Sequence, residues 1–146
     1  MSNRTLTVLD RREFLAQSTL MALGALVASA CGDGLSGSPT GPGAVNVTVQ
    51  IASYTALAAI GGIARLNGTG TPIAVVHSTS TTYRAFSLIC PHAGTTVGIT
   101  GASFRCPNHG ATFASTGSWT GGERTSGLFE FTVAHDATAG TLTIVS

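Results

Sequence analysis

Two short segments of the sequence each combine a cysteine, a histidine and a glycine, which are the residue types of a soft or borderline metal site. The first segment is CPHAG, in which Cys90 begins the motif and His92 follows two positions later. The second is CPNHG, in which Cys106 begins the motif and His109 follows three positions later. Thiolate and imidazole donors at such short spacing indicate metal binding far more often than chance. We therefore predict one metal site with Cys90, His92, Cys106 and His109 as its ligands.

Proline and glycine residues set the shape of both segments. Pro91 and Pro107 directly follow the cysteines and stiffen the backbone there. Gly94 and Gly110 let the backbone pass close to a bulky inorganic group. The sequence between the two motifs, TTVGITGASFR at 95–105, is predicted to fold back as a tight hairpin that brings both motifs to one end of the domain.

The choice of metal follows from how the ligands are distributed. Zinc also binds two cysteines and two histidines, but its structural sites usually group Cys with Cys and His with His. Here each motif supplies one Cys and one His, which suits a two-iron cluster that both motifs span. A structural zinc module stays an alternative, as does a Cys90–Cys106 disulfide, although a disulfide leaves both histidines unexplained. Acyl-transfer catalysis by a Cys/His pair needs no second copy of the motif.

The paired motifs, Cys-x-His from Cys90 and Cys-x-x-His-Gly from Cys106, resemble those of the Rieske 2Fe–2S iron–sulfur family, in the form of an exported bacterial protein. The resemblance extends over about residues 83–119. It implies one 2Fe–2S cluster per chain, with Cys90 and Cys106 on the inner iron and with His92 and His109 on the outer iron. It also implies one-electron transfer as the function, with these four cofactor- and metal-binding residues and no separate catalytic residue.

The sequence around these motifs has the pattern of a small all-β domain. No segment after residue 44 shows a sustained helical hydrophobic period. With the resemblance, this predicts an all-β, Rieske-type antiparallel β-sandwich over 45–146, with a cluster-binding subdomain formed by the two Cys/His loops. The β-prone runs, separated by Gly, Asn, Ser and Thr turns, are 45–51, 73–78, 82–89, 129–135 and 141–145.

The amino-terminal residues have the pattern of a targeting segment. Arg11 and Arg12 precede Phe14-Leu15 and an apolar run over 20–30. This predicts that 1–30 is a twin-arginine-type signal or an N-terminal membrane anchor, with export to the periplasm or the outer face of the cytoplasmic membrane. The Gly/Ser/Pro-rich segment 31–44 is predicted to be a flexible tether. Cys31, directly after Ala28-Ser29-Ala30, resembles the lipid-bearing cysteine of a bacterial lipoprotein.

Charge restricts the range of partners. From Cys31 onward four arginines face four acidic residues, so this part of the chain is formally neutral and offers no basic stripe for nucleic acid. The expected partners are electron donor and acceptor proteins, with a cytochrome b or c or a molybdenum oxidoreductase as candidates and quinol as a further one. Membrane attachment is expected through a lipid on Cys31 or through the N-terminal segment.

Departures from the family pattern narrow the role further. Relatives that oxidise quinols usually carry two additional cysteines that bridge the loops, and Thr95 and Asn108 occupy those positions here. Ala111 and Phe113 stand where a serine and a tyrosine often donate hydrogen bonds that raise the potential. We therefore expect a subunit or partner of a membrane-associated respiratory or periplasmic oxidoreductase, with a potential in the lower or middle Rieske range. The alternative is the Rieske subunit of a quinol–cytochrome c reductase.

The remaining distinctive side chains are expected to be structural. The segment 121–128, which matches a third loop that covers the cluster in the family, has no proline, so its stiffness is in question. His77 and His135 lie in strand-like runs without a paired cysteine. Phe86 and Trp119 are expected to pack in the core, and Arg84, Arg105 and Arg124 to be solvated surface charges.

Overall fold

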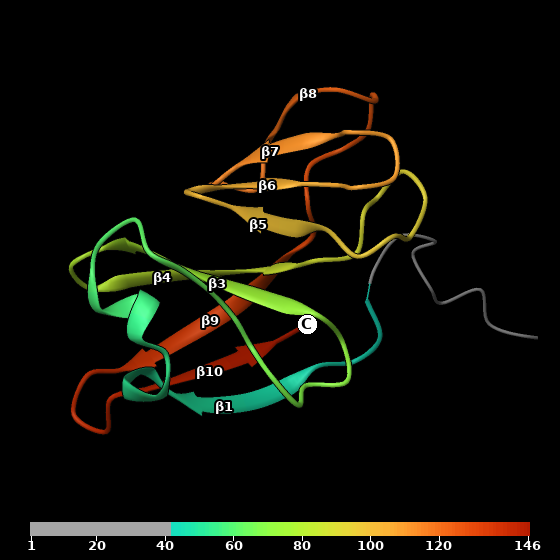
Figure 1. Ribbon diagram of the computed structural model, residues 1–146. Coiled ribbons are helices and arrows are strands. Elements are labelled where there is room, and N and C mark those ends of the chain that lie inside the picture. Colours follow the sequence, from blue (N-terminus) through green and yellow to red (C-terminus); the bar gives the residue numbers. More distant parts are fainter. Residues whose placement is uncertain (1–41) are drawn as a thin grey trace, which may run out of the picture. The chain divides into compact units, whose positions relative to one another are not determined.

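The computed structural model describes residues 42–146, and its strands form two antiparallel sheets (Figure 1). The six-stranded sheet has the order β1-β10-β9-β4-β3-β2, with β1 at Asn46–Gln50, β2 at Ile63–Arg65, β3 at Ile73–Thr79, β4 at Thr82–Ser87, β9 at Glu130–Asp136 and β10 at Thr141–Val145. The four-stranded sheet has the order β5-β6-β7-β8, with β5 at Gly98–Thr100, β6 at Ser103–Arg105, β7 at Thr112–Ala114 and β8 at Trp119–Gly121. Two short 3-10 helices, η1 (Ile51–Ser53) and η2 (Thr55–Ala58), follow β1. The predicted all-β class is confirmed.

Each β-prone run of the sequence forms a strand of the six-stranded sheet, with ends that differ from the prediction by at most two residues. The hairpin predicted within 95–105 is present as β5 and β6, with Gly101 at its turn in a left-handed conformation (φ 59°). Strands β2, β7 and β8 were not predicted, because three residues are too few to show an alternating pattern.

The continuous apolar run at the start of β3 is explained by burial on both faces of its strand. Ile73 and Val75 face one core, and Ala74 and Val76 face the other. Side chains that point to opposite sides of a strand alternate, so a strand covered on both sides needs apolar residues at every position. The first core includes Leu57, Ala85, Phe131, Leu142 and Ile144, and the second core joins β3 and β4 to the four-stranded sheet through Phe86, Phe104 and Phe113.

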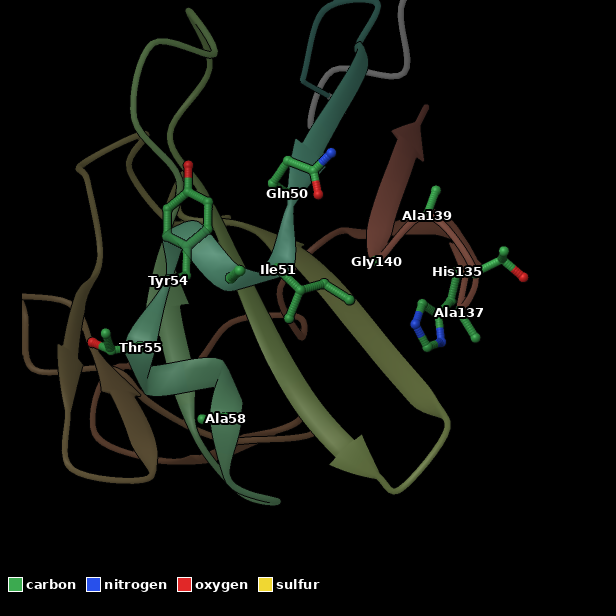
Figure 2. Close-up of a pocket in the computed structure, with 11 residues that line it drawn as sticks. Gln50, Ile51, Tyr54, Thr55, Ala58, His135, Ala137, Ala139 and Gly140 are labelled. Carbon is green, nitrogen blue, oxygen red and sulfur yellow. The ribbon is translucent and has the colours of Figure 1, made fainter.

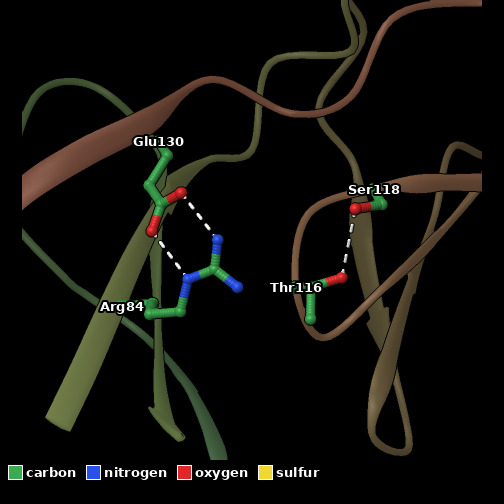
Figure 3. A network of polar contacts seen from close by, with 4 residues as sticks. All are labelled: Arg84, Thr116, Ser118 and Glu130. Atoms are coloured by element: carbon green, nitrogen blue, oxygen red, sulfur yellow. Dashed lines mark hydrogen bonds and ion pairs between the residues drawn. The ribbon is translucent and has the colours of Figure 1, made fainter.

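Figure 3 shows an ion pair between β4 and β9 and a hydrogen bond in the turn between β7 and β8. Arg84 donates two hydrogen bonds of 2.7 Å to the Glu130 carboxylate, and its guanidinium lies 5.1 Å from the Phe86 ring centre. The hydrogen bond to Glu130 raises the pKa of Arg84. The Arg84 side chain is 31% exposed, so it is a partly solvated surface charge that the ion pair with Glu130 neutralises. Nearby in Figure 3, the Thr116 hydroxyl donates to Ser118 over 3.2 Å.

The topology brings both Cys/His motifs to one end of the four-stranded sheet. The first Cys/His loop (residues 90–95) follows β4 and leads into β5, and the second Cys/His loop (residues 106–111) connects β6 to β7. In the antiparallel pair β5–β6, the entry to β5 and the exit from β6 lie at the same end. Figure 1 shows both connections on one side of this sheet, opposite the turn between β5 and β6.

The predicted signal or anchor at 1–30, the lipid site at Cys31 and most of the predicted tether lie outside the described residues. Within residues 42–146 no helix is long and apolar enough to cross a lipid bilayer.

Candidate metal centre

The two Cys/His loops share one backbone design. In the first loop the Cys90 amide donates to the Thr95 carbonyl over 2.8 Å, and the Gly94 amide donates to the Cys90 carbonyl over 2.8 Å. In the second loop the Cys106 amide donates to the fifth residue after it over 2.8 Å, and the Gly110 amide donates to the Cys106 carbonyl over 3.1 Å. The same turn therefore encloses each cysteine, although the histidine is the second residue after the first cysteine and the third after the second.

Both loops close through a glycine with left-handed backbone. Gly94 has a φ of 68° and Gly110 a φ of 73°, a conformation that costs a residue with a side chain roughly 1–2 kcal/mol. The glycines thus let the chain turn back after each cysteine and meet the strand that follows. The expectation that these glycines also let the backbone pass close to an inorganic group stays a prediction.

The two cysteines lie in the interior. Cys90 and Cys106 are each 1% exposed and belong to the core between the two sheets, together with Leu88, Val97 and Phe113. Both are free thiols, and their sulfur atoms lie within hydrogen-bond reach of each other. The interior of the domain therefore presents a pair of sulfur donors.

Backbone amides converge on both sulfur atoms. Burial raises the pKa of Cys90, and the hydrogen bond with Cys106 raises it further. Burial acts in the same direction on Cys106, but hydrogen bonds from the Asn108 amide and from Cys90 outweigh it, so the pKa of Cys106 is lowered. Amide dipoles directed at sulfur stabilise the thiolate, which is the form that binds metal. The donors are the amides of the second and third residues after each cysteine, His92, Ala93, Asn108 and His109.

The two histidines lie at the surface, beside each other. His92 and His109 are exposed, their Nδ1 atoms are 3.1 Å apart, and their rings meet edge to face with centres 4.8 Å apart. Two nitrogen ligands of one tetrahedral ion, with bonds of about 2.0–2.1 Å, lie about 3.3–3.4 Å from each other. The Nδ1 atoms of the two rings therefore already have nearly the separation that shared ligation of one ion requires.

The four predicted ligands thus come together as two pairs. Within residues 42–146 no three His, Cys, Asp or Glu side chains gather around a single point. Instead a buried pair of thiols and an exposed pair of imidazoles are held by the same two loops. A two-iron cluster, with one iron bound by sulfur and the other by nitrogen, needs this division of its ligands. The donor set therefore fits a 2Fe–2S cluster with mixed ligands.

The third loop (residues 121–128) packs directly on the second Cys/His loop. A Cβ atom on Gly122 would lie 1.9 Å from the Gly110 carbonyl oxygen, so only a glycine fits there. At the end of the third loop the Leu128 amide donates to the Gly117 carbonyl over 2.8 Å. The Trp119 indole donates to the Glu123 carbonyl over 3.0 Å. Close backbone packing thus holds this loop without a proline.

Two further sequence expectations can be compared with the structure. Phe86 is 1% exposed, as predicted, but Trp119 is 37% exposed, so the prediction that it packs in the core is wrong. His77 is buried and stacks on Tyr83, with ring centres 4.4 Å apart. His135 donates from Nδ1 to the Thr81 carbonyl over 3.2 Å. Both histidines are structural, as predicted.

A hollow of about 680 Å³ lies away from the predicted ligands, where η1 and η2 meet the turn between β9 and β10 (Figure 2). Figure 2 shows Tyr54 and His135 on opposite sides of it, with Ile51 between them. None of the four predicted ligands lines this hollow. This cavity is therefore not the place where the cysteine and histidine chemistry is gathered.

Comparison with known proteins connects the chain to one family. The family model described as the Rieske [2Fe-2S] domain matches residues 49–132. No curated protein matches the chain. A quaternary ammonium Rieske monooxygenase, studied for carnitine oxidation by gut microbiota, has 23% sequence identity and a TM-score of 0.54 over 68% of this chain. The match covers 30% of the monooxygenase, so this chain spans about a third of its length.

Two other solved structures also match this chain. A chain of a hyperthermophilic respiratory Complex III has 17% identity and a TM-score of 0.51, over 92% of this chain and 99% of that chain. The plasma membrane Rieske protein of the cyanobacterium Synechocystis PCC 6803 has 28% identity and a TM-score of 0.46, over 56% of this chain and 83% of that chain. At 17% identity, the match to the Complex III chain shows that the two chains share a fold.

Proposed function

The chain belongs to the Rieske [2Fe-2S] domain family, and we propose that it transfers single electrons as a subunit or partner of a membrane-associated respiratory or periplasmic oxidoreductase. Membership of the family implies one 2Fe–2S cluster per chain and electron transfer in general. The observation that supports the proposal best is the division of the donors into a buried thiol pair and an exposed imidazole pair.

In this proposal Cys90 and Cys106 bind the inner iron, and His92 and His109 bind the outer iron. A cluster with two histidine ligands supplies one-electron chemistry at roughly −150 to +300 mV. The protein keeps water from the sulfur side, because both cysteines are 1% exposed. It presents the imidazole side to a redox partner, because both histidines are exposed. The electron therefore enters and leaves through the histidine edge.

The loop backbone tunes the site. Four amides point at the two cysteine sulfurs and stabilise negative charge there, which favours the reduced cluster. Ala111 and Phe113 are buried beside the cysteines and carry no hydroxyl group that adds a further donor. We therefore propose a potential in the lower or middle part of the Rieske range.

The place of action is part of the same proposal. Export by the twin-arginine route, attachment through a lipid on Cys31 or through the N-terminal segment, and a periplasmic location are proposed from the sequence pattern of 1–31. Thr95 and Asn108 rule out a disulfide between the loops at those positions, which favours a separate electron carrier over a quinol-oxidising subunit. Co-purification with a cytochrome b, and quinol oxidation by that complex, would favour the alternative instead.

A redox titration of the full chain, produced with its native metal, tests the proposed function. We expect two iron and two sulfide per chain and a reversible titration with one electron per chain. Cys106→Ser is expected to abolish this titration, whereas His135→Gln, a histidine outside the site, is expected to retain it. One zinc per chain and no redox transition would contradict the proposal and identify a structural metal domain.

A further inference from the structure

The positive charges of the described residues are unevenly neutralised. Residues 42–146 contain four arginines and the three acidic residues Glu123, Glu130 and Asp136. Glu130 forms the ion pair with Arg84 that is described above. Asp136 accepts hydrogen bonds from two backbone amides of the turn after β9, both 2.9 Å long. In this part of the chain Arg124 has no ion-pair partner, and neither do Arg65 and Arg105.

These two arginines, which are far apart in the sequence, line the same hollow. The hollow has a volume of about 530 Å³ and lies where β2 meets the β5–β6 hairpin. Arg65 ends β2 and Arg105 ends β6, and Pro107 of the second Cys/His loop completes the wall beside them. No acidic side chain among the described residues lines it. We call this feature the arginine hollow.

The arginine hollow is next to the predicted cluster. Arg105 directly precedes Cys106, and its Nη2 atom lies 3.9 Å from the position that a Cβ on Gly110 would occupy. The guanidinium therefore lies along the second Cys/His loop, whose His109 is exposed. A molecule that binds in the hollow would lie beside the exposed histidine edge.

Electrostatics determines which partner this surface fits. Two like charges in one concave surface repel each other and focus a positive field outward, which attracts a negatively charged partner and speeds its association. Guanidinium groups bind carboxylates through two parallel hydrogen bonds, so Arg favours acidic side chains in particular. Thr96 and Thr100 add hydroxyl groups to the same wall. Such a polar, charged rim is typical of a transient protein interface.

We propose that the arginine hollow is the docking site for acidic side chains of the redox partner protein. The proposal rests on the proposed electron-transfer function, which it extends by naming the surface and the charge of the partner. Carboxylates of the partner bind Arg65 and Arg105, and this contact brings the partner's redox centre to His92 and His109. The binding is electrostatic, so it accelerates the encounter and weakens as salt is added.

Stopped-flow oxidation of the reduced full-length protein tests the docking site. The probe is a blue-copper protein of net negative charge, used at low and at moderate ionic strength. The test variant combines Arg65→Gln with Arg105→Gln, and the matched control combines Arg84→Gln with Arg124→Gln. Both variants lose two positive charges, so a difference between them reports the position of the charges and not the net charge.

We expect the second-order rate constant of the test variant to fall at least about tenfold at low salt and to lose most of its salt dependence, since steering contributes roughly 10- to 1,000-fold. The control is expected to keep most of its rate. Equal rates for the two variants would overturn the docking site. The docking site is also overturned if the test variant slows hexacyanoferrate(III), a small anionic oxidant, but not the acidic protein.

This design distinguishes failure of the docking proposal from failure of the proposed function. The reduced-state EPR signal and the midpoint potential of each protein are measured before its rates. An intact cluster with equal rates contradicts the docking site alone. A wild-type protein without a cluster contradicts the proposed function, and the docking proposal with it.

Discussion

Gly122 holds the third loop against the second Cys/His loop, and a methyl group at this position has no room. The Cβ of Gly122→Ala would lie 1.9 Å from the Gly110 carbonyl oxygen and 2.5 Å from its carbonyl carbon. Contacts of this kind are essentially never shorter than 3.0 Å, so the two backbones have to separate by at least the difference of 1.1 Å. The atoms that have to move belong to the loop that carries His109.

The cost can be divided into two parts. A φ of 72° costs alanine roughly 1–2 kcal/mol, and overpacking against backbone adds roughly 1–3 kcal/mol. Gly68 isolates the first part, because it has a φ of 73° and no atom lies within 4 Å of the position that a Cβ would occupy there. Gly68→Ala is therefore the control, and Gly122→Ala is expected to melt about 5–20 °C lower than this control.

The assay combines thermal unfolding with the iron content of the purified full-length protein. We expect Gly122→Ala to lose cluster as well as stability, because the displaced Gly110 belongs to the ligand loop. Gly68→Ala is expected to keep its full iron content. If both variants melt at the same temperature and retain equal iron, the third loop does not position the second Cys/His loop and the reasoning is refuted.

Three further predictions concern stability and potential. His77→Phe keeps the stack on Tyr83 and removes two buried ring nitrogens that have no hydrogen-bond partner among the described residues. It should therefore stabilise the fold by about 1–2 kcal/mol, and a lower melting temperature than that of the wild type would contradict this. Phe113→Tyr adds a hydroxyl donor beside the cysteines and should raise the midpoint potential by up to about 65 mV, the equivalent of a 1.5 kcal/mol hydrogen bond; an unchanged or lower potential counts against it. A double-mutant cycle on Arg84 and Glu130 should give a coupling energy of about 0.5–1 kcal/mol, because both side chains are partly exposed. A coupling energy of several kcal/mol would contradict this, since it would require a pair that is well shielded from solvent.

Local patterns in the sequence were sufficient to predict the centre of the fold. The duplicated CPHAG and CPNHG motifs place a cysteine and a closing glycine at matching positions, and the backbone of both loops follows this duplication. The run IAVV in 73–76 indicates a strand buried on both sides, as β3 is. Such features depend on neighbouring residues, so they can be recognised without knowledge of tertiary contacts.

Features that depend on distant segments could not be predicted in this way. Arg65 and Arg105 line one hollow only because β2 and the β5–β6 hairpin meet, and the chain between them gives no sign of it. Gly122 was part of a loop whose stiffness was in question, and its contact with Gly110 appears only in three dimensions. The exposure of Trp119 also follows from tertiary structure. Trp119 lies on β8, an edge strand, and its indole donates a hydrogen bond to the Glu123 carbonyl of the third loop.

The most direct test of the central claim is pulsed EPR of the dithionite-reduced full-length protein, purified with its native metal. We predict a rhombic signal with an average g below the free-electron value. We also predict nitrogen couplings from two imidazoles, because we propose that His92 and His109, whose Nδ1 atoms are 3.1 Å apart, bind the same iron. His92→Ala should remove the signal or one of the couplings, whereas His135→Gln should leave both. A cluster signal without nitrogen couplings, or no signal from a protein that contains zinc, would contradict the account.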